Sequence, residues 1–125
     1  MLVLQMKPTE HVSVDHDRLG ALYSQLGEAG AEDIVCRALE EMALRLTHCT
    51  EMYHNENWPS LRKSARSLIA IGDQIGMQVL TRVAADVTKC IDAGDKTALA
   101  ATLSRLIRVG ERSLTMVWDT HETPI

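Results

Sequence analysis

The 125-residue chain is poor in aromatic residues, which make up 3% of it, and phenylalanine is absent. Its core must therefore be built from Leu, Val, Ile, Ala and Met, a set that suits close helix packing better than a β-sandwich. Runs of alternating β-branched residues, the usual sign of strands, are also missing. Apolar residues nevertheless make up 46% of the chain, which argues against intrinsic disorder. These features favour an all-α domain with one core.

The cysteine content excludes the common zinc motifs. The three cysteines, Cys36, Cys49 and Cys90, are an odd number with no close pair, and no CxxC or Cys/His cluster is present. We expect free thiols, buried or half-buried, as is usual in a reducing cytoplasm. The sequence predicts no bound metal and no cofactor.

Several sequence features that mark membrane proteins, nucleic-acid-binding proteins and enzymes are also missing. No apolar run approaches the roughly 20 residues that span a bilayer, and residues 1–6 are too short for a signal peptide. The formal net charge of −4 argues against nucleic-acid binding. The chain has no glycine-rich phosphate loop, no nucleophile elbow and no evident nucleophile–base pair, so we do not expect an enzyme. We expect a soluble, cytoplasmic protein that binds neither membrane nor nucleic acid.

Helical periodicity is the strongest positive signal. It predicts helices over residues 15–26, 31–54, 78–93 and 96–118, with another that begins at Trp58 and has its last apolar position at Ile75. The segment from Gly27 to Gly30, which has a glycine at each end, separates the first helix from the second. Asn57 is a good N-cap before Trp58-Pro59, and Gly94 has the position of a C-cap glycine.

Apolar residues recur at alternating spacings of four and three along the helices, which places one stripe of each helix in a bundle core. We therefore predict an antiparallel up-down four-helix bundle with an extra short N-terminal helix. Residues 1–13 are an N-terminal extension, 14–118 the bundle, and 119–125 a frayed C-terminal tail. The predicted stripe positions are Leu19, Leu22, Tyr23 and Leu26; Val35, Leu39, Met42, Leu46, Cys49 and Tyr53; Leu61, Ala65, Leu68, Gly72 and Ile75; Leu80, Ala84, Val87 and Ile91; and Leu99, Leu103, Leu106, Gly110 and Val117.

The segment that follows Trp58-Pro59 carries a family resemblance. Ala65, Leu68, Gln74 and Gly76 stand in register with the active helix of the histidine-containing phosphotransfer (HPt) domains of bacterial two-component phosphorelays. Upstream, Val14-Asp15 and Leu19 resemble that family's opening helix, and Asn57-Trp58 and Leu61 resemble its entry into the active helix. The resemblance covers about residues 14–117 and implies the HPt-like bundle.

Three departures from the family's pattern cluster where the chemistry of an HPt domain should be. Arg66 stands at the position of the phosphoryl-carrying histidine, Ile69 replaces a lysine, and Ala70 replaces a glycine. These positions share one helix face. A guanidinium stays protonated and offers no free lone pair, so it cannot accept a phosphoryl group. The resemblance therefore implies the fold and the docking face, without phosphotransfer at the usual site.

The altered face carries a local positive charge on an acidic protein. Arg62, Lys63 and Arg66 lie together on it, and no acidic residue occurs between Asn57 and Gly72. The rest of the predicted docking face consists of Ile69, Ala70, Asp73 and Gln74. Asp73 lies two turns beyond Arg66 on the same face, so the sequence leaves open whether it holds the guanidinium.

The resemblance implies a partner in a two-component signalling system. Receiver domains of response regulators have an acidic pocket that the family's active helix meets, so a receiver domain or a histidine kinase is the expected partner. A cationic face would complement that pocket.

Two alternatives stay open. Phosphotransfer could proceed through His48 or His54, which lie outside the apolar stripe and are predicted to be exposed. The chain could instead be a structural or oligomerisation bundle, supported by the apolar ends at residues 1–4 and 116–118. Sequence alone leaves the oligomeric state between a monomer and a weak homodimer.

Overall fold

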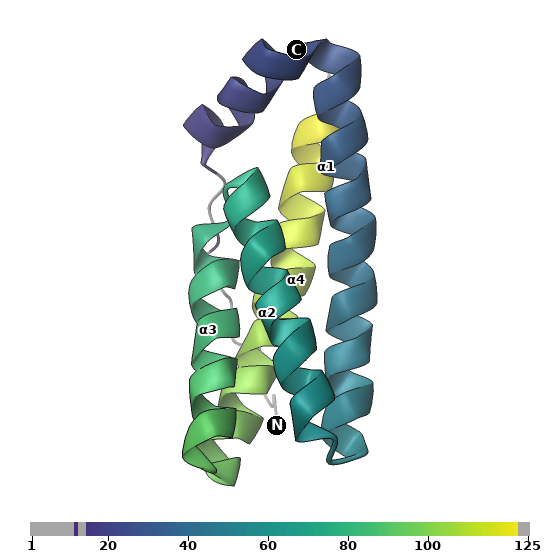
Figure 1. The fold of residues 1–125 in the computed structure, drawn as a ribbon. Coiled ribbons are helices and arrows are strands. Elements are labelled where there is room, and N and C mark those ends of the chain that lie inside the picture. The colour runs from purple at the N-terminus through teal and green to yellow at the C-terminus, as the bar shows by residue number, and fades with distance from the viewer. Residues whose placement is uncertain (1–11, 13–14, 123–125) are drawn as a thin grey trace, which may run out of the picture.

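The structure, a computed structural model, describes residue 12 and residues 15–122, except for the side chains of residues 16 and 118–122. The described residues form four helices: α1 (His16–His54), α2 (Trp58–Ile75), α3 (Gln78–Ala93) and α4 (Lys96–Glu122). Successive helices run in opposite directions and are joined by short turns (Figure 1). The predicted all-α, antiparallel up-down four-helix bundle is confirmed.

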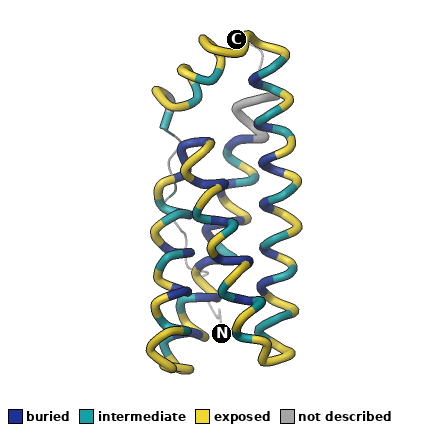
Figure 2. Tube along the Cα trace, viewed as in Figure 1, coloured by how far each residue is buried: buried dark blue, intermediate teal, exposed yellow. Residues whose placement is uncertain are grey.

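The four helices close into a ring around one core. α1 packs against α2, α2 against α3, α3 against α4, and α4 against α1, while α2 and α4 lie diagonally opposite each other. The buried positions recur along the inner side of each helix (Figure 2). The predicted stripe residues from Val35 onward are buried or pack against this core, with Tyr53 and Ile91 only half-buried. Because the stripes fix which side of each helix faces inward, they also fix which side faces solvent.

On the first predicted helix, only Leu19 of the predicted stripe packs against the core. Leu22 is half-buried outside it, and Tyr23 and Leu26 are exposed, so the prediction was wrong for this segment, which bends away from the bundle (Figure 1).

The predicted extra N-terminal helix is the first part of α1, a short arm bent away from the rest of the helix (Figure 1). Gly27 alone leaves helical geometry, with φ 74° and ψ 172°. The predicted break over residues 27–30 is therefore a single-residue kink. Gly30 remains helical, and the absence of its side chain leaves room for Leu26, whose Cβ would lie 3.2 Å from a Cβ at position 30.

The arm is fastened to the turn between α2 and α3. The Asp15 amide donates to the Gly76 carbonyl at 2.8 Å, and Arg18 Nε donates to the Gln74 carbonyl at 3.3 Å. Gly76 has a left-handed φ of 78°, and a Cβ there would lie 2.8 Å from the Asp15 Cβ. Position 76 therefore needs glycine both to end α2 and to admit the arm.

The predicted helix ends agree with the structure for α2 and α3. The Asn57 side chain accepts from the Ser60 amide at 3.3 Å as the N-cap of α2, and Gly94 ends α3 with a left-handed φ of 67°. α4 extends to Glu122, beyond the predicted end at Trp118. The proposed apolar end at residues 1–4 lies outside the described residues, as do residues 123–125 of the predicted tail.

The structure also bears on the expectations about the cysteines and about membrane-spanning segments. Cys36, Cys49 and Cys90 are free thiols, as predicted, and burial raises the pKa of the Cys49 thiol to about 11. None of the helices in the described part of the chain is long and apolar enough to cross a bilayer.

The close approach of α2 and α3 provides a test of the fold. A Cβ on Gly72 would collide with Thr81 Oγ1 and lie 3.0 Å from the Met77 carbonyl oxygen, which cannot move without disturbing the turn. We expect Gly72→Ala to lower the free energy of unfolding by about 1–3 kcal/mol, the usual cost of overpacking. Urea denaturation followed by circular dichroism measures this change.

Gly20→Ala is the matched control, because nothing lies within 4 Å of a Cβ at that position and its backbone is helical. Alanine there should be neutral or stabilise by up to about 1 kcal/mol. Equal stability losses in the two variants would contradict the packing of α2 on α3 described above.

Candidate functional site

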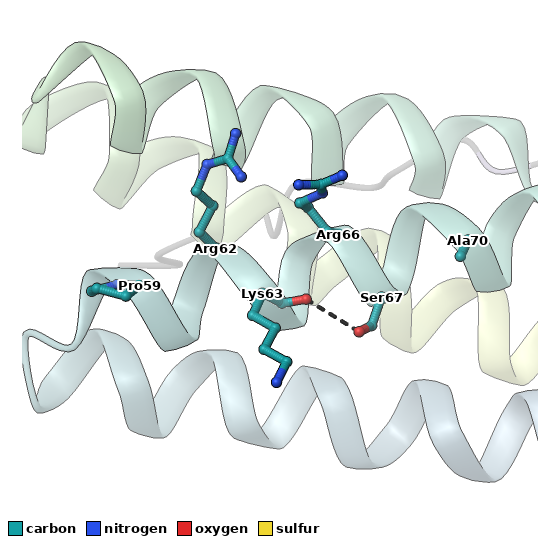
Figure 3. A pocket seen from close by; sticks show the side chains of 6 residues that line it. All are labelled: Pro59, Arg62, Lys63, Arg66, Ser67 and Ala70. Carbon is teal, nitrogen blue, oxygen red and sulfur yellow. Dashed lines mark hydrogen bonds between the residues drawn. The ribbon is translucent and has the colours of Figure 1, made fainter.

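The outer face of α2 holds the predicted docking residues, and a shallow groove runs along it. The groove has a volume of about 430 Å³ and is lined by Pro59, Arg62, Lys63, Arg66, Ser67 and Ala70 (Figure 3). These positions follow the i, i+3, i+4 pattern of one helix face. The inner face of α2 is committed to the core through residues such as Leu61, Ala65 and Leu68, so the cationic residues face outward.

The structure brings together only part of the predicted face. Arg62, Lys63, Arg66 and Ala70 line the groove. Ile69 is half-buried, packs against the core and is not among the residues that line the groove. Asp73 and Gln74 are exposed, but they lie beyond the groove. The Gln74 carbonyl is occupied by Arg18 of the N-terminal arm.

Arg62 is held by an acidic residue from the neighbouring helix. Its Nε donates to Asp92 Oδ1 at 2.8 Å, and its Nη2 donates to Asp92 Oδ2 at 3.1 Å. These two hydrogen bonds form a two-point ion pair between α2 and α3. The hydrogen bond from Arg62 lowers the pKa of the Asp92 carboxyl, as do the charges of Arg62 and Arg66; the same bond raises the pKa of Arg62. Arg62 therefore lines the groove, but its positive charge is offset by the Asp92 carboxylate.

Arg66 and Lys63 form no ion pair within the part of the chain that the structure describes. Arg66 is exposed and forms no ion pair with Asp73 or with any other residue that the structure describes. Figure 3 shows Arg62 and Arg66 extending toward α3, whereas Lys63 extends to the opposite side, toward α1. Ser67 is on the Lys63 side of the helix in the same view, and its hydroxyl donates to the Lys63 carbonyl at 3.1 Å (Figure 3). The groove is therefore flanked by a positive charge on each side.

His48 differs from its prediction. It was expected to be exposed, but it is half-buried, and its Nδ1 lies 2.6 Å from the hydroxyl of Ser64, a residue of α2 that is 1% exposed. Which atom donates depends on the imidazole tautomer. The second ring nitrogen, Nε2, is left without a hydrogen bond among the described residues. His54 is exposed, as predicted, with its ring edge-on to Tyr53.

Sequence reasoning missed Asp92, Pro59, Ser67 and Ser64. Pro59 and Ser67 share the helix face of Arg62 and Arg66, so the 3.6-residue period alone would have found them. Asp92 and Ser64 required knowledge of which residues face each other across the turns. In the described part of the chain, no three His, Cys, Asp or Glu side chains are grouped closely enough to hold a metal ion.

The Arg62–Asp92 pair provides a test of this geometry. The pKa of Asp92 should lie below its ordinary value of 3.8, and Arg62→Gln should raise it toward that value. Because the folded pKa is lowered, any stability from the pair is present above pH 3.8 and is lost as pH falls through the folded pKa. Carboxyl ¹³C chemical shifts followed through a pH titration measure it. An unchanged Asp92 pKa in Arg62→Gln would contradict the pair.

Comparisons with known proteins give no relative from which a role could be transferred. No protein-family model matches the chain, and no curated protein or solved structure matches it significantly. The geometry and charge of the α2 face are therefore the observations from which a function can be argued.

Proposed function

We propose that this chain is an HPt-like protein that has lost the phosphoryl-carrying histidine and acts by docking the acidic pocket of a response-regulator receiver domain. A histidine kinase is the other partner that the resemblance allows. The observation that carries the proposal is the unpaired, exposed guanidinium of Arg66 in a groove on the outer face of α2. It stands where the family places its carrier histidine.

The chemistry of Arg66 suits binding and not transfer. Its guanidinium has five N–H donors, which match the two oxygens of a carboxylate, but it has no lone pair with which to attack phosphorus. A carboxylate from a receiver could therefore pair with Arg66 at two points. Such pairs across an interface mainly set encounter rate and orientation.

The bundle supports a rigid docking surface. The inner side of α2 is packed against α1 and α3, and Arg62 is tied to α3 through Asp92. A cation presented on a fixed helix loses less conformational entropy on binding than one on a mobile loop. Lys63, on the other side of the groove, broadens the positive surface that an acidic partner would meet.

The test is binding to the purified receiver domains of the same cell by isothermal titration calorimetry. Arg66→Glu should weaken the interaction at least about tenfold, because an opposing carboxylate replaces a paired cation. Arg112→Glu is the matched control, since Arg112 is an exposed cation on α4, the helix diagonal to α2, and the net charge change is the same. Full-affinity binding by Arg66→Glu, or no binding to any receiver, would contradict the proposal.

Phosphotransfer through His48 is a second candidate, and the Ser64 hydrogen bond favours it. In the tautomer whose Nδ1–H donates to the Ser64 hydroxyl, Nε2 carries the free lone pair that could accept a phosphoryl group.

This candidate predicts acid-labile label on the wild-type protein after incubation with a cognate kinase and radiolabelled ATP. His48→Gln should remove the label, and Ser64→Ala should reduce it. His54→Gln, the matched control, should keep it, because the imidazole hydrogen-bonded to Ser64 is that of His48, whereas His54 is exposed. An unlabelled wild-type protein would eliminate this candidate and leave the docking proposal in place.

A further inference from the structure

We infer that the turn between α2 and α3 is a docking site for the N-terminal arm of a second copy of this chain, with Gly27 as the hinge of the exchange. In the structure the arm, the part of α1 before Gly27, docks on the turn of its own chain. The same contacts would join two chains in a dimer. This surface lies apart from the α2 groove and does not depend on the proposed function.

Gly27 is the hinge because it is the one residue within α1 that leaves helical geometry (Figure 1). Its φ of 74° and ψ of 172° lie in a region that only glycine adopts readily. The residues on both sides are helical, so a change of this single residue to helical angles would make α1 one straight helix. The arm would then leave the turn of its own chain.

Few contacts hold the arm in its closed position. Besides the two hydrogen bonds from Asp15 and Arg18 to the turn, the arm packs against the core through Leu19. Tyr23 is 36% exposed and Leu26 is 47% exposed, so these two large apolar side chains remain partly uncovered. An element with little buried apolar surface opens more readily than the helices of the core.

The receiving site belongs to the bundle and not to the arm. The carbonyl groups of Gln74 and Gly76, which accept the two hydrogen bonds, lie at the end of α2. A Cβ at position 76 would lie 2.8 Å from the Asp15 Cβ and 3.1 Å from the Arg18 Cβ, so the missing side chain leaves the space in which the arm begins. Each chain therefore carries a complete receiving site, whether its own arm is closed or open.

A second copy is the occupant that best satisfies an open arm. Release of the arm into water would expose Leu19 and would separate the Asp15 amide from the Gly76 carbonyl. Two chains that exchange arms recover both contacts, because each turn accepts the arm of the other chain. Exchange of an identical element between two copies is a common route to dimers, and a short, strained hinge favours it.

Gly27→Ala tests the hinge, because alanine disfavours the bent geometry and favours a straight helix. In sedimentation equilibrium of the full chain, the dimer dissociation constant should fall at least about tenfold below that of the wild-type protein, since both hinges shift toward the open form. Gly20→Ala is the matched control. It lies in the helical part of the arm with nothing within 4 Å of its Cβ, so it should leave the constant unchanged.

The position of the arm distinguishes exchange from side-by-side association. In an equal mixture of ¹³C-labelled and unlabelled Gly27→Ala chains, refolded together from urea, isotope-filtered NOEs should connect Asp15 of one chain with Gly76 of the other. Adding Leu19→Ser should weaken this dimer at least about tenfold, because the open monomer has no Leu19 contact to lose. Adding Leu44→Ser, at an exposed site of α1 outside the arm, should not weaken it.

Equal dissociation constants of Gly27→Ala and the wild-type protein would overturn the inference. A dimer that lacks the NOEs between chains, or that Leu19→Ser leaves unchanged, would also overturn it. If circular dichroism shows that Gly27→Ala does not fold, the wild-type mixture, refolded at its highest soluble concentration, decides. NOEs between Asp15 and Gly76 of different chains then support the inference, and contacts solely within one chain overturn it.

Discussion

The apolar stripe of α2 is the constraint on which the candidate site depends. Leu61, Ala65 and Leu68 must face the core, and on a helix of 3.6 residues per turn this directs the side chains of Arg62, Lys63 and Arg66 away from it. The charges are therefore displayed by the same packing that folds the bundle. Because α2 lies between α1 and α3, its exposed face is a narrow strip, and the cations gather along a single groove.

The turns at the two ends of α2 determine which residues from other helices reach that strip. Arg62 and Asp92 lie at equal distances along the chain on either side of Met77, and His48 and Ser64 at equal distances on either side of Glu56. Antiparallel helices joined by short turns bring such residues level with each other, which explains both contacts. The Asp92 carboxylate offsets the charge of Arg62, and the Ser64 hydroxyl holds the imidazole of His48. The lengths of the two turns therefore determine the charge on this face as well as the fold.

The same reasoning shows what the sequence could and could not predict. The fold and the ends of α2 and α3 followed from local signals: the apolar period, the Asn57 cap and the Gly94 terminus. The pairing of Arg62, the half-burial of His48 and the position of Ile69 depend on contacts between helices, which local patterns do not contain. The turn symmetry would have identified Asp92 and Ser64 in advance. The kink in α1 lies at Gly27 alone. Either Gly27 or Gly30 could interrupt a helix, and the sequence does not indicate which of the two leaves helical geometry.

The central claim is that the outer face of α2 is a binding surface whose effect depends on Arg66. The most direct measurement is amide NMR of the isotopically labelled chain during titration with a receiver domain. The account predicts shift changes confined to the exposed positions of α2 and the adjoining surfaces of α1 and α3, centred on Arg66. Changes centred instead on the diagonal helix α4, or on the N-terminal arm around Tyr23 and Leu26, would contradict it.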